Sequence, residues 1–278
     1  MPFRSPLFMS ISWWRMIESC AVKSIDGTPL RVWVGGTGPP IVLVHGSFTD
    51  HTAWTVPSTH LQKHFTVFAM DRRGFGASGD ESEYSIERDF EDVSVVVAAV
   101  AARTGQPVVL WGHSYGANCA MGGASLSTDV QHLILYEPSL GIAYPEGVIE
   151  EVEAALAAGD RETAVNRMLI DVLEMSTAEV DALKAGPRWP LILAGAHTAP
   201  RECRVEQSWE YLPGQFAGIQ APTLLLSGSE SPDSVTSATR RAAGAIADSR
   251  IHVLEGYGHF AHRTHPEMVV SLIRDFIS

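Results

Sequence analysis

Residues 108–119 read VVLWGHSYGANC, and this stretch decides how the rest of the chain is interpreted. The run 108–111 is apolar throughout, as in a strand that is buried on both faces of a sheet. Two glycines then flank a serine with one residue on each side, which favours a sharp strand-to-helix turn with Ser114 exposed at its apex. Gly112 and Gly116 would let the strand and the helix pass closely. An ordinary Gly-rich turn can have the same letters, so the surrounding elements and the chemical partners of Ser114 must support this interpretation.

The elements around this stretch alternate between apolar strands and helices. The helix expected over residues 85–102 has apolar side chains at spacings of three and four, as an amphipathic helix requires. Alternation of this kind predicts an α/β fold, with a mostly parallel twisted sheet and helices on both faces. Further helices are expected from Tyr115 and over 267–277. The predicted strands cover residues 31–34, 41–44, 66–70, 107–111, 133–136, 222–226 and 251–254.

One segment, residues 141–213, interrupts the alternation with several apolar helical faces and no good strand. It falls between two sheet strands, and ligands of open parallel sheets bind beyond the carboxyl ends of the strands. We therefore expect a helical cap over the site. The core would comprise residues 20–140 and 214–278, and residues 1–19 would form a leader or docking arm.

Composition excludes several classes of function. The 278 residues carry a net charge of −12, which argues against nucleic-acid binding and against anionic membrane surfaces. The three cysteines are far apart and form no C-x-x-C pair, so neither a disulfide framework nor a zinc knuckle is expected. No apolar run approaches the roughly 18 residues of a membrane span. The arm does not read as a clean signal peptide, so a cytoplasmic location is the default expectation.

A serine hydroxyl is a weak nucleophile, so Ser114 needs a base and oxyanion donors. His259 is the best-placed histidine because it follows the last predicted strand, in EGYGHFAHRTHPE. His262 and His265 read as surface residues. The backbone N–H groups of Tyr115 and of Ser47, in the loop after strand 41–44, would form the oxyanion hole.

These motifs, in this order, resemble the α/β-hydrolase superfamily from about residue 20 to the end of the chain. The matching pieces are VHGS (44–47), DRRGFGAS (71–78), GHSYG (112–116) and GHF (258–260). The resemblance implies Ser114 as nucleophile, His259 as base, and Ser47 and Tyr115 as oxyanion donors. The insertion matches the cap domain of the family.

The position of the acid departs from the common family pattern. Many members carry it three residues past the glycine of PTLLLSG, where this chain has Ser231. Glu137, at the end of strand 133–136, is the leading candidate, and it resembles the acid of zearalenone-type lactonases and of some haloalkane dehalogenases. Asp233 and Glu230 are the alternatives, if the later loop is shifted.

A serine, a base and an oxyanion hole together perform acyl transfer. The leading hypothesis is a carboxylic-ester hydrolase that acts on small or medium apolar molecules through an acyl-serine, with no cofactor and no metal. A lactonase, a carbon–carbon bond hydrolase or a cofactor-free perhydrolase would use the same residues, and an inactive small-ligand receptor is the hypothesis from another class. The expected pocket is apolar, and its candidate wall residues are Phe48, Met168, Trp189 and Trp209.

Overall fold

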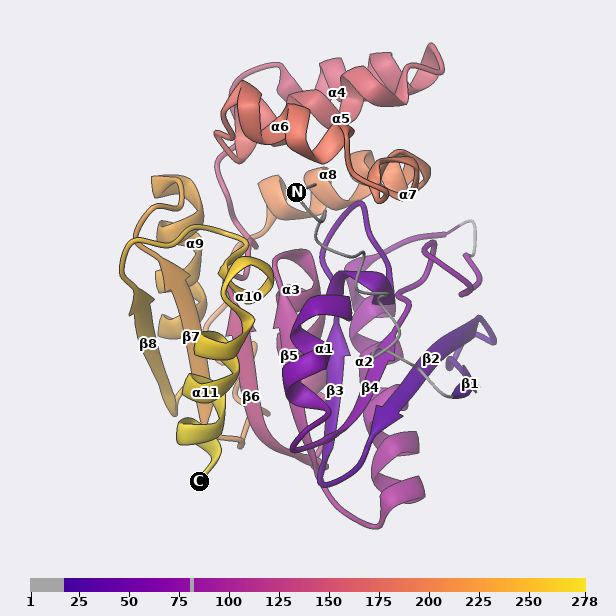
Figure 1. Ribbon diagram of the computed structural model, residues 1–278, viewed down its shortest axis with the longest axis vertical. Helices are drawn as coiled ribbons and strands as arrows, with labels where there is room; N and C mark the ends of the chain where they lie inside the picture. The colour runs from indigo at the N-terminus through magenta and orange to yellow at the C-terminus, as the bar shows by residue number, and fades with distance from the viewer. Residues whose placement is uncertain (1–17, 81–82) are drawn as a thin grey trace, which may run out of the picture.

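The computed structural model describes residues 18–80 and 83–278 (Figure 1). The arm expected over residues 1–19 lies outside the described residues, except for Glu18 and Ser19, which open the first strand. No helix in the described ranges is both long enough and apolar enough to cross a membrane.

The described residues form an eight-stranded sheet with the order β1-β2-β4-β3-β5-β6-β7-β8. Strand β2 pairs antiparallel with β1 and β4, and the strands from β4 to β8 pair in parallel. The predicted mostly parallel sheet is therefore confirmed. The strands are β1 (Glu18–Lys23), β2 (Pro29–Gly36), β3 (Pro40–Val44), β4 (Thr66–Met70), β5 (Val108–His113), β6 (Val130–Tyr136), β7 (Thr223–Gly228) and β8 (Ser249–Leu254).

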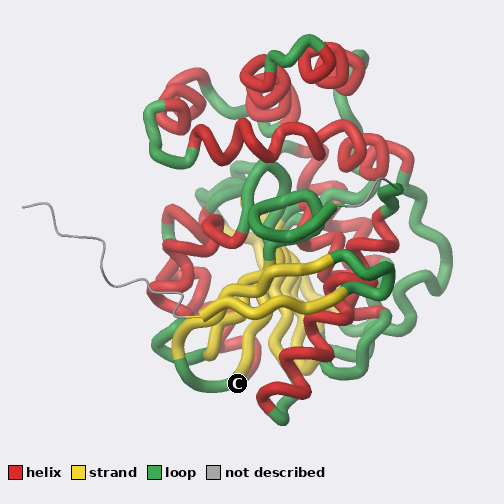
Figure 2. Tube along the Cα trace, turned by 90° about the vertical axis from the view of Figure 1, so that its right-hand side faces the viewer, coloured by secondary structure: helices red, strands yellow, loops and turns green. Residues whose placement is uncertain are grey.

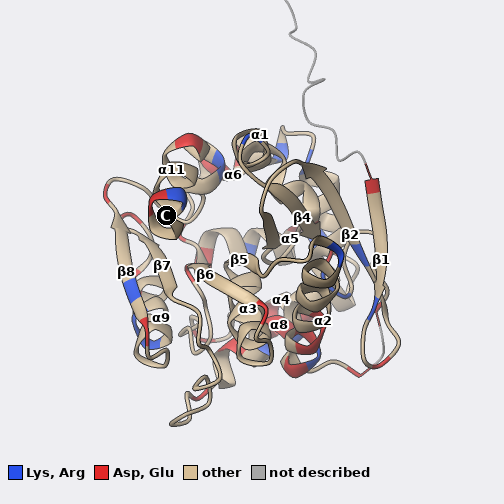
Figure 3. Cartoon of the chain, turned by 90° about the horizontal axis from the view of Figure 1, so that it is seen from below, with Lys and Arg blue, Asp and Glu red and all other residues tan. Residues whose placement is uncertain are grey.

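Helices cover both faces of the sheet (Figure 3). Helices α2 (Ile86–Thr104), α3 (Tyr115–Ser125) and α9 (Asp233–Gly244) lie on one face, and α1 (Thr55–Leu61) and α11 (Pro266–Ile277) lie on the other. Side chains of β5 alternate between two hydrophobic clusters, because successive residues of a strand point to opposite faces. Val108 and Leu110 join the α2–α3 cluster, whereas Val109 and Trp111 join the α1–α11 cluster.

Helix α2 illustrates how the sequence pattern determines the packing. Its buried residues Phe90 and Val93 follow the predicted apolar spacing, and they pack where α3 has Gly122 and Gly123. A Cβ atom at Gly122 would lie 2.0 Å from the Phe90 ring, so only glycine permits this helix–helix approach. The helix ends at Gly105, whose φ of 68° provides the left-handed C-cap.

The segment between β6 and β7 forms a helical layer above the carboxyl ends of the strands (Figures 1 and 2). Its α6 helix begins with a capping box, in which Ser176 and Glu179 exchange hydrogen bonds. The layer contains α4 (Val148–Ala157), α5 (Arg161–Arg167), the π-helical turn η2 (Met168–Val172), α6 (Thr177–Lys184), α7 (Trp189–Ala194), the 3₁₀ turn η3 (Gly195–Thr198) and α8 (Ala199–Ser208). We refer to α4–α8 as the cap helices.

Candidate active site

Ser114 lies at the sharp turn between β5 and α3, with φ 56° and ψ −129°. Its N–H donates to the Tyr136 carbonyl of the neighbouring strand over 2.8 Å, which anchors the turn to the sheet. Both flanking glycines are required by close backbone contacts. A Cβ atom at Gly112 would lie 2.4 Å from the Gly116 carbonyl oxygen, and one at Gly116 would lie 2.2 Å from that of His45. The close passage expected from the GHSYG stretch is confirmed.

His259 and Glu137 meet at the carboxyl edge of the sheet. Glu137 follows β6, and His259 lies between β8 and the short helix α10 (Ala261–Thr264). The Nδ1 atom of His259 is hydrogen-bonded to Oε2 of Glu137. The other carboxylate oxygen accepts the Gly228 N–H over 2.7 Å, and the glutamate side chain is fully buried. Glu137 is thus fixed from two sides and presents one oxygen to the imidazole.

The two alternative acids lie elsewhere. Asp233 is an exposed residue in the first turn of α9, and Glu230 is exposed in the loop before it. Neither carboxylate is hydrogen-bonded to His259 among the contacts of residues 18–80 and 83–278. Ser231, which stands at the usual acid position, is buried, and its hydroxyl has no partner in the same ranges. The later loop is therefore not arranged to orient the imidazole.

Unusual backbone conformations concentrate at this edge. Among the described residues, four that are not glycine have a positive φ, and Phe48, Ser114 and Glu137 are three of them. Residues in such conformations cost free energy and persist only where the surroundings enforce them, which is common at functional sites. This clustering is an observation independent of the sequence motifs.

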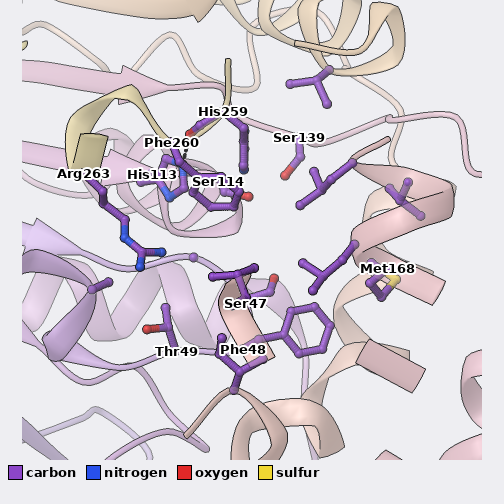
Figure 4. Close-up of a pocket in the computed structure, with 18 of the residues that line it drawn as sticks. Ser47, Phe48, Thr49, His113, Ser114, Ser139, Met168, His259, Phe260 and Arg263 are labelled. Carbon is purple, nitrogen blue, oxygen red and sulfur yellow. Dashed lines mark hydrogen bonds between the residues drawn. The ribbon is translucent and has the colours of Figure 1, made fainter. Parts of the chain in front are cut away.

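The two expected oxyanion donors, Tyr115 and Ser47, lie next to Ser114. Tyr115 is the first residue of α3, so its N–H has no acceptor within the helix and lies at the positive end of the helix dipole. Ser47 lines the same cavity as Ser114 (Figure 4). The loop that carries Ser47 is pressed against the turn, since a Cβ atom at Gly46 would lie 3.0 Å from Cβ of Ser114.

Two buried histidines support His259. The His113 Nε2 atom lies 2.9 Å from the His259 carbonyl oxygen, and its ring centroid is 4.1 Å from that of His262. Burial and neighbouring positive charges hold the pKa of both His113 and His262 well below the usual range. His113 therefore packs beneath the turn and holds the backbone of His259. The interpretation of His262 as a surface residue is wrong, because an i+3 spacing from His259 turns it inward under α10.

A cavity between the cap helices and the sheet contains the site (Figure 4). Ser114, His259 and Ser47 lie at its floor, and Phe48 and Met168 contribute to its wall. Trp189 and Trp209, the other two candidate wall residues, do not line it. Trp189 packs among the cap helices, and Trp209 packs against Phe90 and Phe216 in the core.

A buried carboxyl group that the sequence did not reveal also lines the cavity. Glu206, on α8, is hydrogen-bonded to the hydroxyl groups of Ser139 and Tyr144. Burial raises the pKa of Glu206 to about 7. No sequence signal pointed to this group, because Glu206 lies on a largely polar helix, where burial of a carboxyl group is not expected.

One group of possible metal ligands occurs within the described ranges, at Asp50, His51 and Asp71. Its carboxylate oxygens already accept protein hydrogen bonds. Asp71 accepts from Trp33 Nε1 over 2.9 Å and from the Ala77 N–H over 3.0 Å, and Asp50 caps the 3₁₀ turn η1 (His51–Trp54). These contacts make the group part of the loop framework.

The family model that matches this chain and the two curated relatives described here are hydrolases by name. The model of the Alpha/beta hydrolase family matches residues 41–272. A curated relative, (E)-2-((N-methylformamido)methylene)succinate hydrolase of Acinetobacter baylyi, is 28% identical over 244 residues, which are 84% of this chain and 88% of the relative. The 2-hydroxymuconate semialdehyde hydrolase of a Pseudomonas species is 27% identical over 258 residues, which are 87% of this chain and 88% of that protein.

Solved structures of hydrolases have the same fold as this protein. An alpha/beta hydrolase from Sphaerobacter thermophilus superposes with a TM-score of 0.79 at 29% identity, covering 93% of this chain and all 100% of its own. The enol-lactonase of Burkholderia xenovorans has a TM-score of 0.73 at 22% identity and covers 93% and 99%, a likeness that concerns the fold alone. The family model spans most of the chain and includes the turn at Ser114 and the loop at His259, so this protein belongs to the alpha/beta hydrolase family.

Proposed function

We propose that the protein is a serine hydrolase that cleaves carboxylic esters through an acyl-serine intermediate. The observation that carries the proposal is the buried contact between Glu137 and Nδ1 of His259, because His259 lines the same cavity as Ser114. A carboxylate at Nδ1 holds the imidazole in the tautomer that leaves Nε2 free to accept a proton. Such an arrangement suits proton transfer from the serine hydroxyl.

The proposed reaction has two halves. His259 Nε2 takes the proton of Ser114 as its oxygen attacks the ester carbonyl, and the imidazolium then gives that proton to the departing alcohol. A water molecule, deprotonated by the same nitrogen, attacks the acyl-serine and releases the acid. The N–H groups of Tyr115 and Ser47 stabilise the oxyanion in both halves, and Glu137 stabilises the imidazolium.

The experiment compares wild type with Ser114→Ala and with the control Ser231→Ala. Ser231 is a buried serine that does not line the cavity. Wild type and the control should hydrolyse a short 4-nitrophenyl ester and be labelled covalently by an organophosphonate, whereas Ser114→Ala should do neither. Peptide mass spectrometry should place the label on Ser114. Label on another serine, or undiminished turnover in Ser114→Ala, would contradict the proposal, and a wild type without turnover would favour a receptor.

A second candidate, hydrolysis of a carbon–carbon bond or a lactone, is favoured by the names of similar proteins. Two curated relatives are named as hydrolases of a substituted methylenesuccinate and of 2-hydroxymuconate semialdehyde, and one structural neighbour is an enol-lactonase. A panel of simple esters, lactones and vinylogous diketones, compared by kcat/KM, decides between the candidates. Ester hydrolysis remains the proposal if the esters are the best substrates.

A further inference from the structure

Two arginine side chains line the cavity without an acidic partner. Arg188 precedes α7 in the cap, and Arg263 lies on α10, one turn after His259. Among the ion pairs of the described ranges, neither arginine takes part in one. Because an arginine keeps its charge in a protein, two positive charges face this cavity without an ion-pair partner among the described residues.

The local contacts show that the two charges affect each other. Burial and the charge of Arg188 lower the pKa of Arg263 to about 10, and burial also lowers that of Arg188. Arg188 donates from Nη2 to the Thr49 hydroxyl over 2.7 Å, and its Nε is buried without a partner within the described chain. Asp50 raises the pKa of Arg188 but forms no ion pair with it. An unpaired buried donor and two cations that repel each other cost free energy, and a bound anion would relieve both costs.

The cavity is cationic on one side of Ser114 (Figure 4). On the other side most of its lining is apolar, with the hydroxyl group of Ser139 and the carboxyl group of Glu206 as polar exceptions. Figure 4 shows Arg263 and Thr49 on one side of Ser114 and Ser47, and Met168 on the opposite side. The Thr49 hydroxyl accepts from Arg188, so its own proton is free to point into the cavity. The apolar side is completed by Ile142, Leu169, Val172 and Val235.

From this juxtaposition we infer that Arg188, Arg263 and Thr49 form a subsite for a carboxylate of the substrate. The inference rests on the proposed function and narrows it to acyl compounds that carry a carboxylate on one side of the scissile carbonyl and an apolar group on the other. The planar guanidinium groups suit the two oxygens of a carboxylate, and the threonine hydroxyl supplies a further donor. In a chain with a net charge of −12, such a local cationic end also favours entry of an anion in one orientation.

The test uses matched pairs of chromogenic esters. Each pair combines a 4-nitrophenyl half-ester of succinate, glutarate or adipate with the ester of a monocarboxylic acid in which a methyl group replaces the free carboxylate. Wild type should prefer at least one half-ester over its neutral partner in kcat/KM. Arg188→Met and Arg263→Met should each reduce that preference roughly tenfold or more, because each removes charged hydrogen bonds to the anion. Arg240→Met, which changes an exposed arginine outside the cavity, should retain it.

A binding measurement separates the subsite from the chemistry. The free dicarboxylates should bind Ser114→Ala in calorimetric titration, and binding should weaken by a similar factor when Arg188→Met or Arg263→Met is added. The subsite is wrong if wild type has no half-ester preference, or if the arginine variants leave both the preference and dicarboxylate binding unchanged. A failure of Ser114→Ala to abolish turnover, with dicarboxylate binding retained, would instead contradict the proposed nucleophile and leave the subsite standing.

Discussion

Glu137 has a φ of 49°, and the backbone turn at this residue directs its carboxylate toward the loop that carries His259 rather than along the direction of β6. The same residue donates its N–H to the Leu226 carbonyl over 3.0 Å, so the turn is tied to the adjacent strand. A carboxylate that is buried and held by the Gly228 N–H has no freedom to move away as charge develops on the imidazole. In the proposed reaction, this one residue would both orient the imidazole and supply its counter-charge.

Glu137→Gln should lower kcat by about 10⁴-fold while the protein stays folded, since the amide keeps the shape but loses the charge and favours the wrong imidazole tautomer. Initial rates with a 4-nitrophenyl ester measure kcat, and circular dichroism of the same samples shows whether the variant is folded. Asp233→Asn is the matched control, because it removes an exposed carboxylate from the alternative loop and should cost little. The reverse ranking of the two variants would move the acid to that loop.

At the scale of elements, the turn at Ser114 depends on how closely α3 passes β3 and β5. Gly116 has the tightest of these contacts, with backbone oxygens of His45 and Val44 at 2.2 and 2.4 Å from a Cβ atom placed there. Backbone atoms within a sheet have little room to retreat. The position of the nucleophile is therefore fixed by packing of whole elements and not by the turn alone.

Gly116→Ala should lower the free energy of unfolding by about 1–3 kcal/mol and reduce esterase activity, because the added methyl group forces α3 away from β3. Gly244→Ala is the matched control. Gly244 is the last residue of α9, and no atom lies within 4 Å of a Cβ atom placed there, so alanine should stabilise the protein by about 0.5–1 kcal/mol. Denaturant titrations measure both changes, and equal effects of the two substitutions would refute the packing argument.

The sequence predicts a strand or helix well where its burial produces a continuous apolar run or a periodic apolar face. Strands β3 and β5 are buried along their whole length and read as apolar runs, so they were readily predicted. Strand β1 lies at the sheet edge with no fully buried residue, and its sequence ESCAVK has no such run. The apolar faces of the cap helices predict that these helices form. They do not predict that the Trp189 side chain packs within the cap instead of lining the cavity, because packing between helices distant in sequence sets its orientation.

At the scale of the whole molecule, the cap and the core are joined by buried charges. Arg72, which follows β4, forms an ion pair with Glu202 of α8, and both side chains are nearly inaccessible to solvent. The sequence could not predict that these two residues pair, because they are 130 positions apart in the chain. Glu206, one turn further along α8, adds a second buried carboxyl group to the same helix. Such groups make the stability of the assembled molecule depend on pH.

The buried carboxyl groups and the buried histidines should make the free energy of unfolding change with pH in opposite directions. The pKa of His45 is lowered from 6.5 to about 4 by burial, so the folded state holds fewer protons there and stability is lost as the pH falls below 6.5. Glu206 behaves in the opposite way. Its pKa is raised by burial from 4.5 to about 7, so the folded state holds more protons than the unfolded state between these values, and stability is lost as the pH rises through them.

Glu206→Gln should therefore become more stable relative to wild type as the pH rises from 5 to 8, by up to about 3 kcal/mol, the free energy that corresponds to the difference between the two pKa values. Glutamine keeps an oxygen and an amide for the hydroxyl groups of Ser139 and Tyr144 but cannot ionise. The histidine contributions are common to both proteins and cancel in the difference. Denaturant titrations at pH 5, 6, 7 and 8 measure this difference. Glu153→Gln, which changes a half-exposed carboxylate of α4 that pairs with Arg204, is the control. A difference that stays constant across this range would show that Glu206 does not titrate there, and that the cap–core junction carries its charge without cost.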